Sequence, residues 1–216
     1  MRSLTLRSGA SSPLNILCLG AHSDDIEIGC GGTVLRLIEE HPGCVLHWVV
    51  FSALGVRAEE ARQGAALFAR KASLKGPVLK DFQDGFMPFS GTQVKLAFEE
   101  LKAVSPDLIF THYGRDAHQD HRLISELTWN TFRDHLILEY EIPKYDGDLG
   151  QPNVFVPLEP EFFQKKVRYI VETFQSQRTK RWFTEETFSG LMRLRGMECQ
   201  APSGYAEAFY SRKIVL

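Results

Sequence analysis

Short apolar runs alternate with longer helical patterns along the first 135 residues. The runs at 15–20 and 107–112 are rich in Ile, Leu, Val and Phe, which is typical of buried parallel strands, and two further strands are predicted at 45–51 and 78–82. Helical patterns at 30–40, 57–72, 91–103 and 121–135 follow the four strands in turn. Parallel strands need a crossover between them, usually a helix. The alternation therefore predicts an α/β fold with a doubly wound, mostly parallel, Rossmann-like sheet.

The pattern changes after residue 136. Extended segments at 138–143 and 153–157 flank a turn rich in Gly and Asp at 146–150, and helices are predicted at 159–175 and 184–194. The closing residues 212–216 are predicted as an edge strand. We expect a polar leader at 1–14 and one domain over 15–216, with a C-terminal α+β extension in which about 136–210 shapes the substrate site.

Composition narrows the class of protein. A chain of 216 residues with 44% hydrophobic residues suits one globular domain, and a net charge of −2 gives no overall reason to expect nucleic acid or an anionic membrane as partner. No apolar run approaches the ~18 residues of a membrane span, and the four cysteines form no CxxC pair. We expect a cytoplasmic protein with reduced thiols and no stable membrane insertion, and the sequence leaves open whether it forms a homo-oligomer.

Two clusters of His and Asp follow the first and the fourth predicted strands, at 21–25 and 118–121. Loops that leave the carboxyl ends of parallel strands lie along one edge of the sheet, so these clusters can converge. Catalytic zinc takes about three protein ligands and keeps a position for water. His22 and Asp25, three residues apart, can reach one ion, and His121 can complete the set. The clusters therefore predict one Zn²⁺ per chain.

The other members of the two clusters can then take catalytic roles. Asp24 is placed to accept a proton from water, His118 to face a developing oxyanion, and Asp120 to hold an imidazole in one tautomer. The simpler alternative is that Asp24 or Asp25 only caps the following helix. Two such clusters at corresponding strand ends favour the metal site over the cap.

Both clusters resemble the signatures of the PIG-L/LmbE-like de-N-acetylases. Their first signature is Ala-His-Pro-Asp-Asp-x-Glu-x-Gly-x-Gly-Gly-Thr, and residues 21–33 read Ala-His-Ser-Asp-Asp-Ile-Glu-Ile-Gly-Cys-Gly-Gly-Thr. Their second is Thr-His-x-x-x-Asp-x-His-x-Asp-His-Arg, and residues 111–122 read Thr-His-Tyr-Gly-Arg-Asp-Ala-His-Gln-Asp-His-Arg. Only Ser23 departs from these patterns, where the family has proline. The resemblance covers about the first 125 residues.

The resemblance implies the same ligands and assigns the remaining roles. It implies zinc on His22, Asp25 and His121, with Asp24 as general base and His118 stabilising the tetrahedral intermediate or protonating the departing amine. Weaker similarities to the family suggest substrate contacts at Arg57 and Asp84, and a match to the family's late Ala-Glu-x-Phe segment suggests one at Glu207. Phe174 stands where the family often has a histidine on a late helix.

The function that these residues predict is zinc-dependent removal of an acetyl or other acyl group from the nitrogen of an amino sugar or its conjugate. The expectation that the substrate is an amino sugar rests on the resemblance alone. A metal-dependent phosphoesterase stays open, although it usually needs a second metal and more bridging carboxylates. A sugar-binding module without catalysis also stays open, although it would not need Asp24. For Arg57, a solvated side chain without a role is as good an interpretation as a substrate contact. The loop at 139–157 could cover the site, and an ordinary surface loop is an equally good interpretation.

Overall fold

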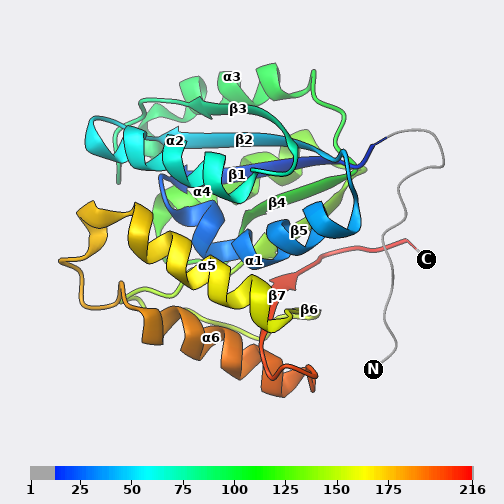
Figure 1. Ribbon diagram of the computed structural model, residues 1–216. Helices are drawn as coiled ribbons and strands as arrows, with labels where there is room; N and C mark the ends of the chain where they lie inside the picture. The colour runs from blue at the N-terminus through cyan, green and yellow to red at the C-terminus, as the bar shows by residue number, and fades with distance from the viewer. Residues whose placement is uncertain (1–12, 216) are drawn as a thin grey trace.

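Strand β1 (Asn15–His22) is an inner strand of a seven-stranded sheet (Figure 1). The computed structural model describes residues 13–215, and within them the strand order is β3-β2-β1-β4-β5-β7-β6. The first five strands in this order are parallel neighbours, whereas β7 pairs antiparallel with both β5 and β6. The other strands are β2 (Val45–Ser52), β3 (Ser73–Leu79), β4 (Leu108–His112), β5 (Leu136–Tyr140), β6 (Val154–Pro157) and β7 (Ala206–Tyr210).

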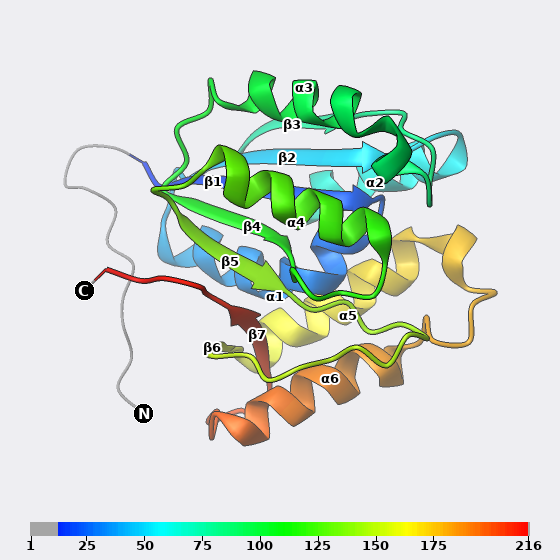
Figure 2. The same ribbon diagram turned by 180° about the vertical axis from the view of Figure 1, so that it is seen from behind.

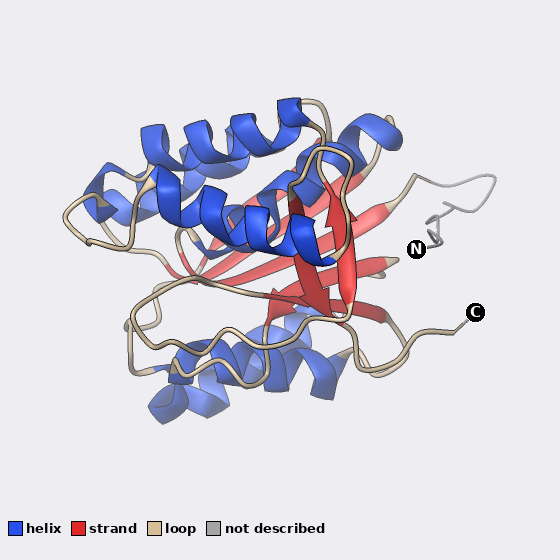
Figure 3. Cartoon of the chain, turned by 90° about the horizontal axis from the view of Figure 1, so that it is seen from below, coloured by secondary structure: helices blue, strands red, loops and turns tan. Residues whose placement is uncertain are grey.

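Helices cover both faces of this sheet. Figure 1 shows α1, α2 and α5 in front of the strands with α6 beside α5, and Figure 2 shows α3 and α4 on the opposite face. The view from below shows the strands between these helical layers (Figure 3). The helices are α1 (Asp25–Glu40), α2 (Val56–Phe68), α3 (Gly91–Leu101), α4 (Gln119–Thr131), α5 (Pro160–Thr173) and α6 (Glu185–Glu198), with short 3₁₀ turns η1 (Met87–Ser90) and η2 (Gln175–Gln177). None of the helices between residues 13 and 215 is both long and apolar enough to cross a membrane.

The alternation of side chains along β1 explains why its sequence is apolar throughout. Ile16 and Cys18 enter the core on the side of α1 and α5, whereas Leu17 and Leu19 enter the core on the side of α3 and α4. All four side chains are fully buried. A strand that is buried on both faces has no polar face to show, which gives the continuous apolar run of the sequence.

The topology has its switch point at the carboxyl ends of β1 and β4. The chain moves from β1 to β2 and β3 on one side, and β4 and β5 lie on the other side of β1. The loops after β1 and β4 therefore diverge, and in open α/β sheets ligands bind at such a switch point. His22 ends β1 and His112 ends β4, so both signature segments begin at this edge.

The predicted doubly wound fold is confirmed, with local differences. Helix α1 begins at Asp25 rather than at residue 30, because its early glycines make the first turns a weak helical pattern. Those glycines allow close packing, since a Cβ on Gly29 would overlap the ring of Tyr140 and one on Gly31 would overlap Phe68. Strand β3 spans Ser73–Leu79 rather than 78–82.

The predicted edge strand at 212–216 is wrong for residues 212–215, which form no strand. The last strand is β7, which lies between β5 and β6 and was hidden by its two alanines and a glutamate, all poor strand formers. Most of the predicted polar leader, residues 1–12, and residue 216 lie outside the described residues.

Candidate metal centre

Three donor atoms from the two signature segments form a small triangle. His22 Nδ1 lies 3.1 Å from His121 Nε2 and 3.3 Å from Asp25 Oδ2, and the third edge, from His121 Nε2 to Asp25 Oδ2, is 3.6 Å. Zinc bonds of about 2.0–2.1 Å in a tetrahedron place neighbouring ligand atoms about 3.3–3.4 Å apart. The three atoms therefore fit one tetrahedral ion with a fourth position left over.

Strand and helix ends bring these ligands together. His22 is the last residue of β1, Asp25 is the first residue of α1, and His121 lies in the first turn of α4. The turn between His22 and Asp25 is closed by a hydrogen bond from the His22 backbone N–H to Asp25 Oδ2, at 2.6 Å. The amino ends of helices are positive, which favours the carboxylate of Asp25 at this place.

The charges around the triangle suit a cation. Burial alone would lower the pKa of His22, but Asp25, Asp120 and Asp84 outweigh it and raise the pKa well above its usual value. The pKa of His121 falls to about 4 because of burial and the neighbouring His112, so its ring is neutral at pH 7 and can bind a metal. The carboxylates around His22 favour positive charge at this place, which a divalent cation would supply once His22 gives up its proton to bind it.

His112, which the sequence analysis did not assign, lies beside the triangle without completing it. Its Nε2 lies 3.2 Å from Asp25 Oδ2 and its ring stacks on that of His121, with centroids 3.9 Å apart. The same nitrogen accepts a hydrogen bond from the Ala21 N–H at 2.9 Å, so its lone pair is already used. Three groups of possible ligands among residues 13–215 have donor atoms that all lie within 4.8 Å of one another, and one of these groups is formed by Asp25, His112 and His121. The hydrogen bond at Nε2 argues against His112 as a ligand.

Asp116 orients the ring of His121. Its Oδ2 lies 2.9 Å from His121 Nδ1, which fixes the proton on Nδ1 and turns Nε2 towards the triangle. The Lys144 ammonium lies 3.0 Å from Asp116 Oδ1 and 2.5 Å from Asp148 Oδ2. Burial would raise the pKa of Asp116, but the hydrogen bond from His121 and the nearby positive charges hold it well below its usual range. Neither Asp116 nor Lys144 was assigned a role from sequence.

The second nitrogen of His22 faces two further carboxylates. His22 Nε2 lies 3.0 Å from Asp84 Oδ1 and 3.3 Å from Asp120 Oδ2. Asp120 is fully buried and also accepts hydrogen bonds from the N–H groups of Gly85 and Met87, at 2.7 and 3.1 Å. Asp120 therefore has the contact that the tautomer role requires, and it ties the loop after β3 to α4.

Asp24 and Asp84 are bridged by Arg57. The guanidinium lies 3.1 Å from Asp24 Oδ1 and 3.2 Å from Asp84 Oδ2. Burial and the charge of Asp25 raise the pKa of Asp24, against the opposing effect of Arg57. The hydrogen bond to His22 is the main reason that the pKa of Asp84 falls to about 2. Asp24 occupies the N-cap position of α1 but makes no side-chain capping bond, so the cap does not account for its carboxylate.

His118 lies over the same cluster. Its ring centroid is 4.9 Å from that of His22 and 4.6 Å from that of His121, and its Nδ1 accepts a hydrogen bond from the Asp120 N–H at 3.3 Å. A neutral ring that accepts at Nδ1 carries its proton on Nε2. Burial, followed by the charge of His22, lowers the pKa of His118.

Glu27 is a buried carboxyl without a partner. It is fully buried, and neither of its side-chain oxygens has a hydrogen-bond partner among residues 13–215. A Cβ on Gly64 would collide with both the Glu27 carboxyl and the Phe174 ring, so the ring and the carboxyl share one small space. Burial is the main reason that the pKa of Glu27 is raised well above its usual value, and the charges of Asp24 and Asp25 add to it.

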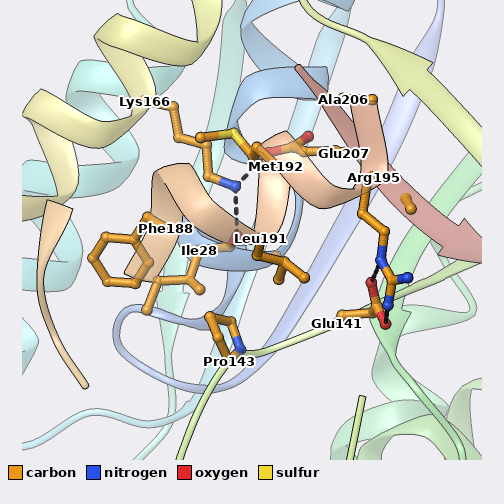
Figure 4. Close-up of a pocket in the computed structure, with 12 residues that line it drawn as sticks. Ile28, Glu141, Pro143, Lys166, Phe188, Leu191, Met192, Arg195, Ala206 and Glu207 are labelled. Carbon is orange, nitrogen blue, oxygen red and sulfur yellow. Dashed lines mark hydrogen bonds and ion pairs between the residues drawn. The ribbon is translucent and has the colours of Figure 1, made fainter. Parts of the chain in front are cut away.

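The structure does not bring Glu207 to the cluster. Its carboxylate accepts hydrogen bonds from Gly32 N and Thr33 N, at 2.8 and 2.6 Å, and pairs with Lys166 Nζ at 2.6 Å. Figure 4 shows this pair beneath α1, where Lys166 also donates to the Ile28 carbonyl. The adjoining cavity of about 20 Å³ has room for one water. Because both oxygens are engaged in the core, the substrate contact expected at Glu207 is not supported.

Comparisons with known proteins agree with the two signatures. The profile of the family described as "PIG-L: GlcNAc-PI de-N-acetylase" matches residues 17–132. The chain is 28% identical to the uncharacterized deacetylase YaiS of Escherichia coli (strain K12) in an alignment of 183 positions that covers 75% of this chain and 91% of that one.

Solved structures with the same fold carry more than one activity. The N,N'-diacetylchitobiose deacetylase of Pyrococcus horikoshii matches with a TM-score of 0.69 and 18% identity, over 92% of this chain and 84% of that one. The 4-carboxy-2-hydroxymuconate hydratase GalB of Pseudomonas putida KT2440 matches with a TM-score of 0.75 and 17% identity, over 94% and 98%. These likenesses concern the fold, and the family is given by the sequence match, which spans more than half of the chain. The chain therefore belongs to the PIG-L family of de-N-acetylases.

Proposed function

We propose that this protein is a zinc-dependent amidohydrolase that removes an N-acetyl group from an amino sugar or an amino-sugar conjugate. The observation that carries the proposal is the triangle of His22, Asp25 and His121 donor atoms, with edges of 3.1–3.6 Å, beside the buried carboxylate of Asp24. Membership of a de-N-acetylase family supports the reaction class.

His22, Asp25 and His121 would hold one zinc ion, which when bound acts as a Lewis acid and lowers the pKa of water at the site. Asp24 accepts the proton of the attacking water. Arg57 engages Asp24 Oδ1, so Oδ2 is the oxygen that takes this proton. His118, with its proton on Nε2, donates a hydrogen bond to the developing oxyanion, and the proton that Asp24 took from water passes to the amide nitrogen as the C–N bond breaks. Water and amide become acetate and a free amine.

The sugar part of the proposal rests on relatives. The family description names GlcNAc-PI, and a solved relative acts on N,N'-diacetylchitobiose, so both descriptions involve N-acetylated amino sugars. On this chain, Asp84 is the first proposed substrate contact, because its side chain is 56% exposed while it contacts the buried His22. Arg57 lies beside it and is the second proposed substrate contact.

Metal content and acetate release test the proposal. The zinc-loaded protein should contain about one zinc per chain and release acetate from at least one member of a panel of free, nucleotide-linked and lipid-linked N-acetylglucosamine derivatives. Asp24→Asn should keep the zinc and lose at least about 100-fold in kcat, the range for a general base. Asp134→Asn, which changes an aspartate that is 90% exposed, is the matched control and should keep full activity.

Four results would contradict the proposal or one of its residue roles. Two metals per chain with hydrolysis of phosphate esters would favour a phosphoesterase. Sugar binding without turnover would favour a binding module. Unchanged turnover in Asp24→Asn would remove Asp24 from the mechanism. His121→Ala should lose zinc and activity together, and full metal occupancy in that variant would exclude it as a ligand.

A further inference from the structure

A second concave surface lies beside α4, a helix on the face seen in Figure 2, and is lined by residues of α4 and of the segments that follow α4, β4 and β7. It is an open groove of about 620 Å³, which falls within the ~300–1,000 Å³ range of small-molecule sites. We call it the α4 groove. Its lining residues are Gly114, Arg122, Glu126, Trp129, Asn130, Arg133, Arg212 and Lys213.

The α4 groove concentrates positive charge in a protein whose net charge is −2. Four of its eight lining residues are Arg or Lys and one is acidic. Among residues 13–215, no carboxylate lies within 4 Å of the charged groups of Arg122, Arg133 or Lys213. Their hydrogen bonds go to backbone carbonyls instead: Arg122 donates to Asp116 O, Arg133 to Asn130 O and Lys213 to Arg133 O. These carbonyls position the cations without neutralising them.

A buried carboxylate holds the fourth cation in place. Glu139 is 2% exposed, and its Oε1 accepts hydrogen bonds from Arg212 Nε at 2.7 Å and from the Trp129 indole. The guanidinium of Arg212 lies 4.6 Å from the centroid of the Trp129 ring. A Cβ on Gly114 would lie 2.6 Å from Arg212 Nη2, so the glycine leaves room for the guanidinium. Arg212 is thus fixed by an aromatic ring and a buried acid while its side chain stays 49% exposed.

We infer that the α4 groove binds a phosphorylated small molecule, at a site separate from the metal centre. Guanidinium groups with free N–H donors match the paired oxygens of phosphate, and several cations together favour a ligand with at least two negative charges. Glu126 in the lining and Glu139 beside Arg212 are two carboxylates against four cations, so the α4 groove keeps an excess of positive charge. None of the lining residues belongs to the His22 triangle, and α4 links the two sites, since Arg122 directly follows His121 in that helix.

The inference can be tested with pyrophosphate as the probe. The zinc-loaded full chain is titrated calorimetrically at low salt, and zinc content is measured afterwards to detect removal of the metal. The double variant Arg133→Gln/Lys213→Gln should bind pyrophosphate about tenfold more weakly or worse, because one hydrogen bond between charged groups contributes about a factor of ten. The control Arg70→Gln/Lys75→Gln removes two exposed cations elsewhere and should bind like the natural protein.

Each other outcome overturns the inference. Equal binding by the natural protein and the groove variant would place the anion elsewhere, such as at the zinc. Equal weakening in both double variants would mean that only overall charge matters. No binding by the natural protein would remove the site. A single-stranded oligonucleotide that binds far more tightly than pyrophosphate, with the same dependence on Arg133 and Lys213, would assign the groove to nucleic acid instead.

Discussion

Removal of the Lys166 ammonium tests whether Glu207 stabilises the core or contacts the substrate. The two side chains are only 4% and 3% exposed and lie 2.6 Å apart. In Lys166→Met the carboxylate of Glu207 stays buried beneath α1 and keeps only the N–H groups of Gly32 and Thr33 as donors. We expect a large loss of stability with little change in substrate affinity.

The size of the loss follows from burial. Removing one partner of a buried ion pair leaves an uncompensated charge and costs about 3–5 kcal/mol, a large part of the ~5–15 kcal/mol that stabilises a typical domain. Lys165 is the matched control, because its side chain is 34% exposed and pairs with Glu161 on the surface. Lys165→Met should cost about 0–1 kcal/mol. The double variant Lys166→Met/Glu207→Gln removes both charges and should recover much of the loss.

Urea unfolding at a fixed zinc concentration measures these differences, and acetate release on the folded variants gives KM. A substrate contact at Glu207 predicts the opposite result: Glu207→Gln would raise KM and leave the unfolding free energy unchanged. That outcome, or equal stability of Lys166→Met and Lys165→Met, would refute the assignment of Glu207 to the core.

Three further changes have defined outcomes. Asp116→Asn removes the acceptor that orients a zinc-binding imidazole and should weaken zinc binding about 10–100-fold in a chelator competition, whereas unchanged affinity would contradict that role. The free energy of unfolding of the natural protein should fall as the pH rises above about 4.5, because the raised pKa of the buried Glu27 keeps its proton bound in the folded state while the unfolded chain releases it. Glu27→Gln should flatten this fall in unfolding experiments from pH 4 to 8, and an unaltered slope would count against the argument. Gly29→Ala should lower the free energy of unfolding by at least about 1–3 kcal/mol, because the added Cβ would overlap the Tyr140 ring. Gly190→Ala, which has open space around it, should leave the free energy of unfolding unchanged or raise it, and equal melting temperatures of the two variants would disprove the packing argument.

The parts of the fold that could be predicted are those where burial dictates sequence. Strands β1 and β4 are buried on both faces, so their residues are apolar and easily seen. The start of α1 was missed because Gly29 and Gly31 meet side chains of other elements, a reason that only the folded chain reveals. Strand β7 was missed because its pairing with β5 and β6 overrides the poor strand propensity of its residues.

The convergence at the metal centre could be predicted because strand ends meet at one edge of the sheet. That rule placed His22 and His121 near each other, and the donor atoms lie 3.1 Å apart. The role of Lys144 could not be predicted, because its partner Asp116 lies in a distant segment and a lone lysine forms no motif. The ion pair between Glu207 and Lys166 could not be predicted for a related reason, since only the fold brings the two side chains together.

The contact between Lys144 and Asp116 has a practical consequence for altering specificity. Lys144 follows β5, beyond the residues 17–132 that carry the family match, yet it reaches the acid that aligns a ligand of the ion. Grafting the second half of one relative onto another would therefore exchange more than the residues around the substrate. A chimera without a cation at the position of Lys144 should bind its metal more weakly. The second half used in such a graft should therefore carry a lysine or arginine at that position.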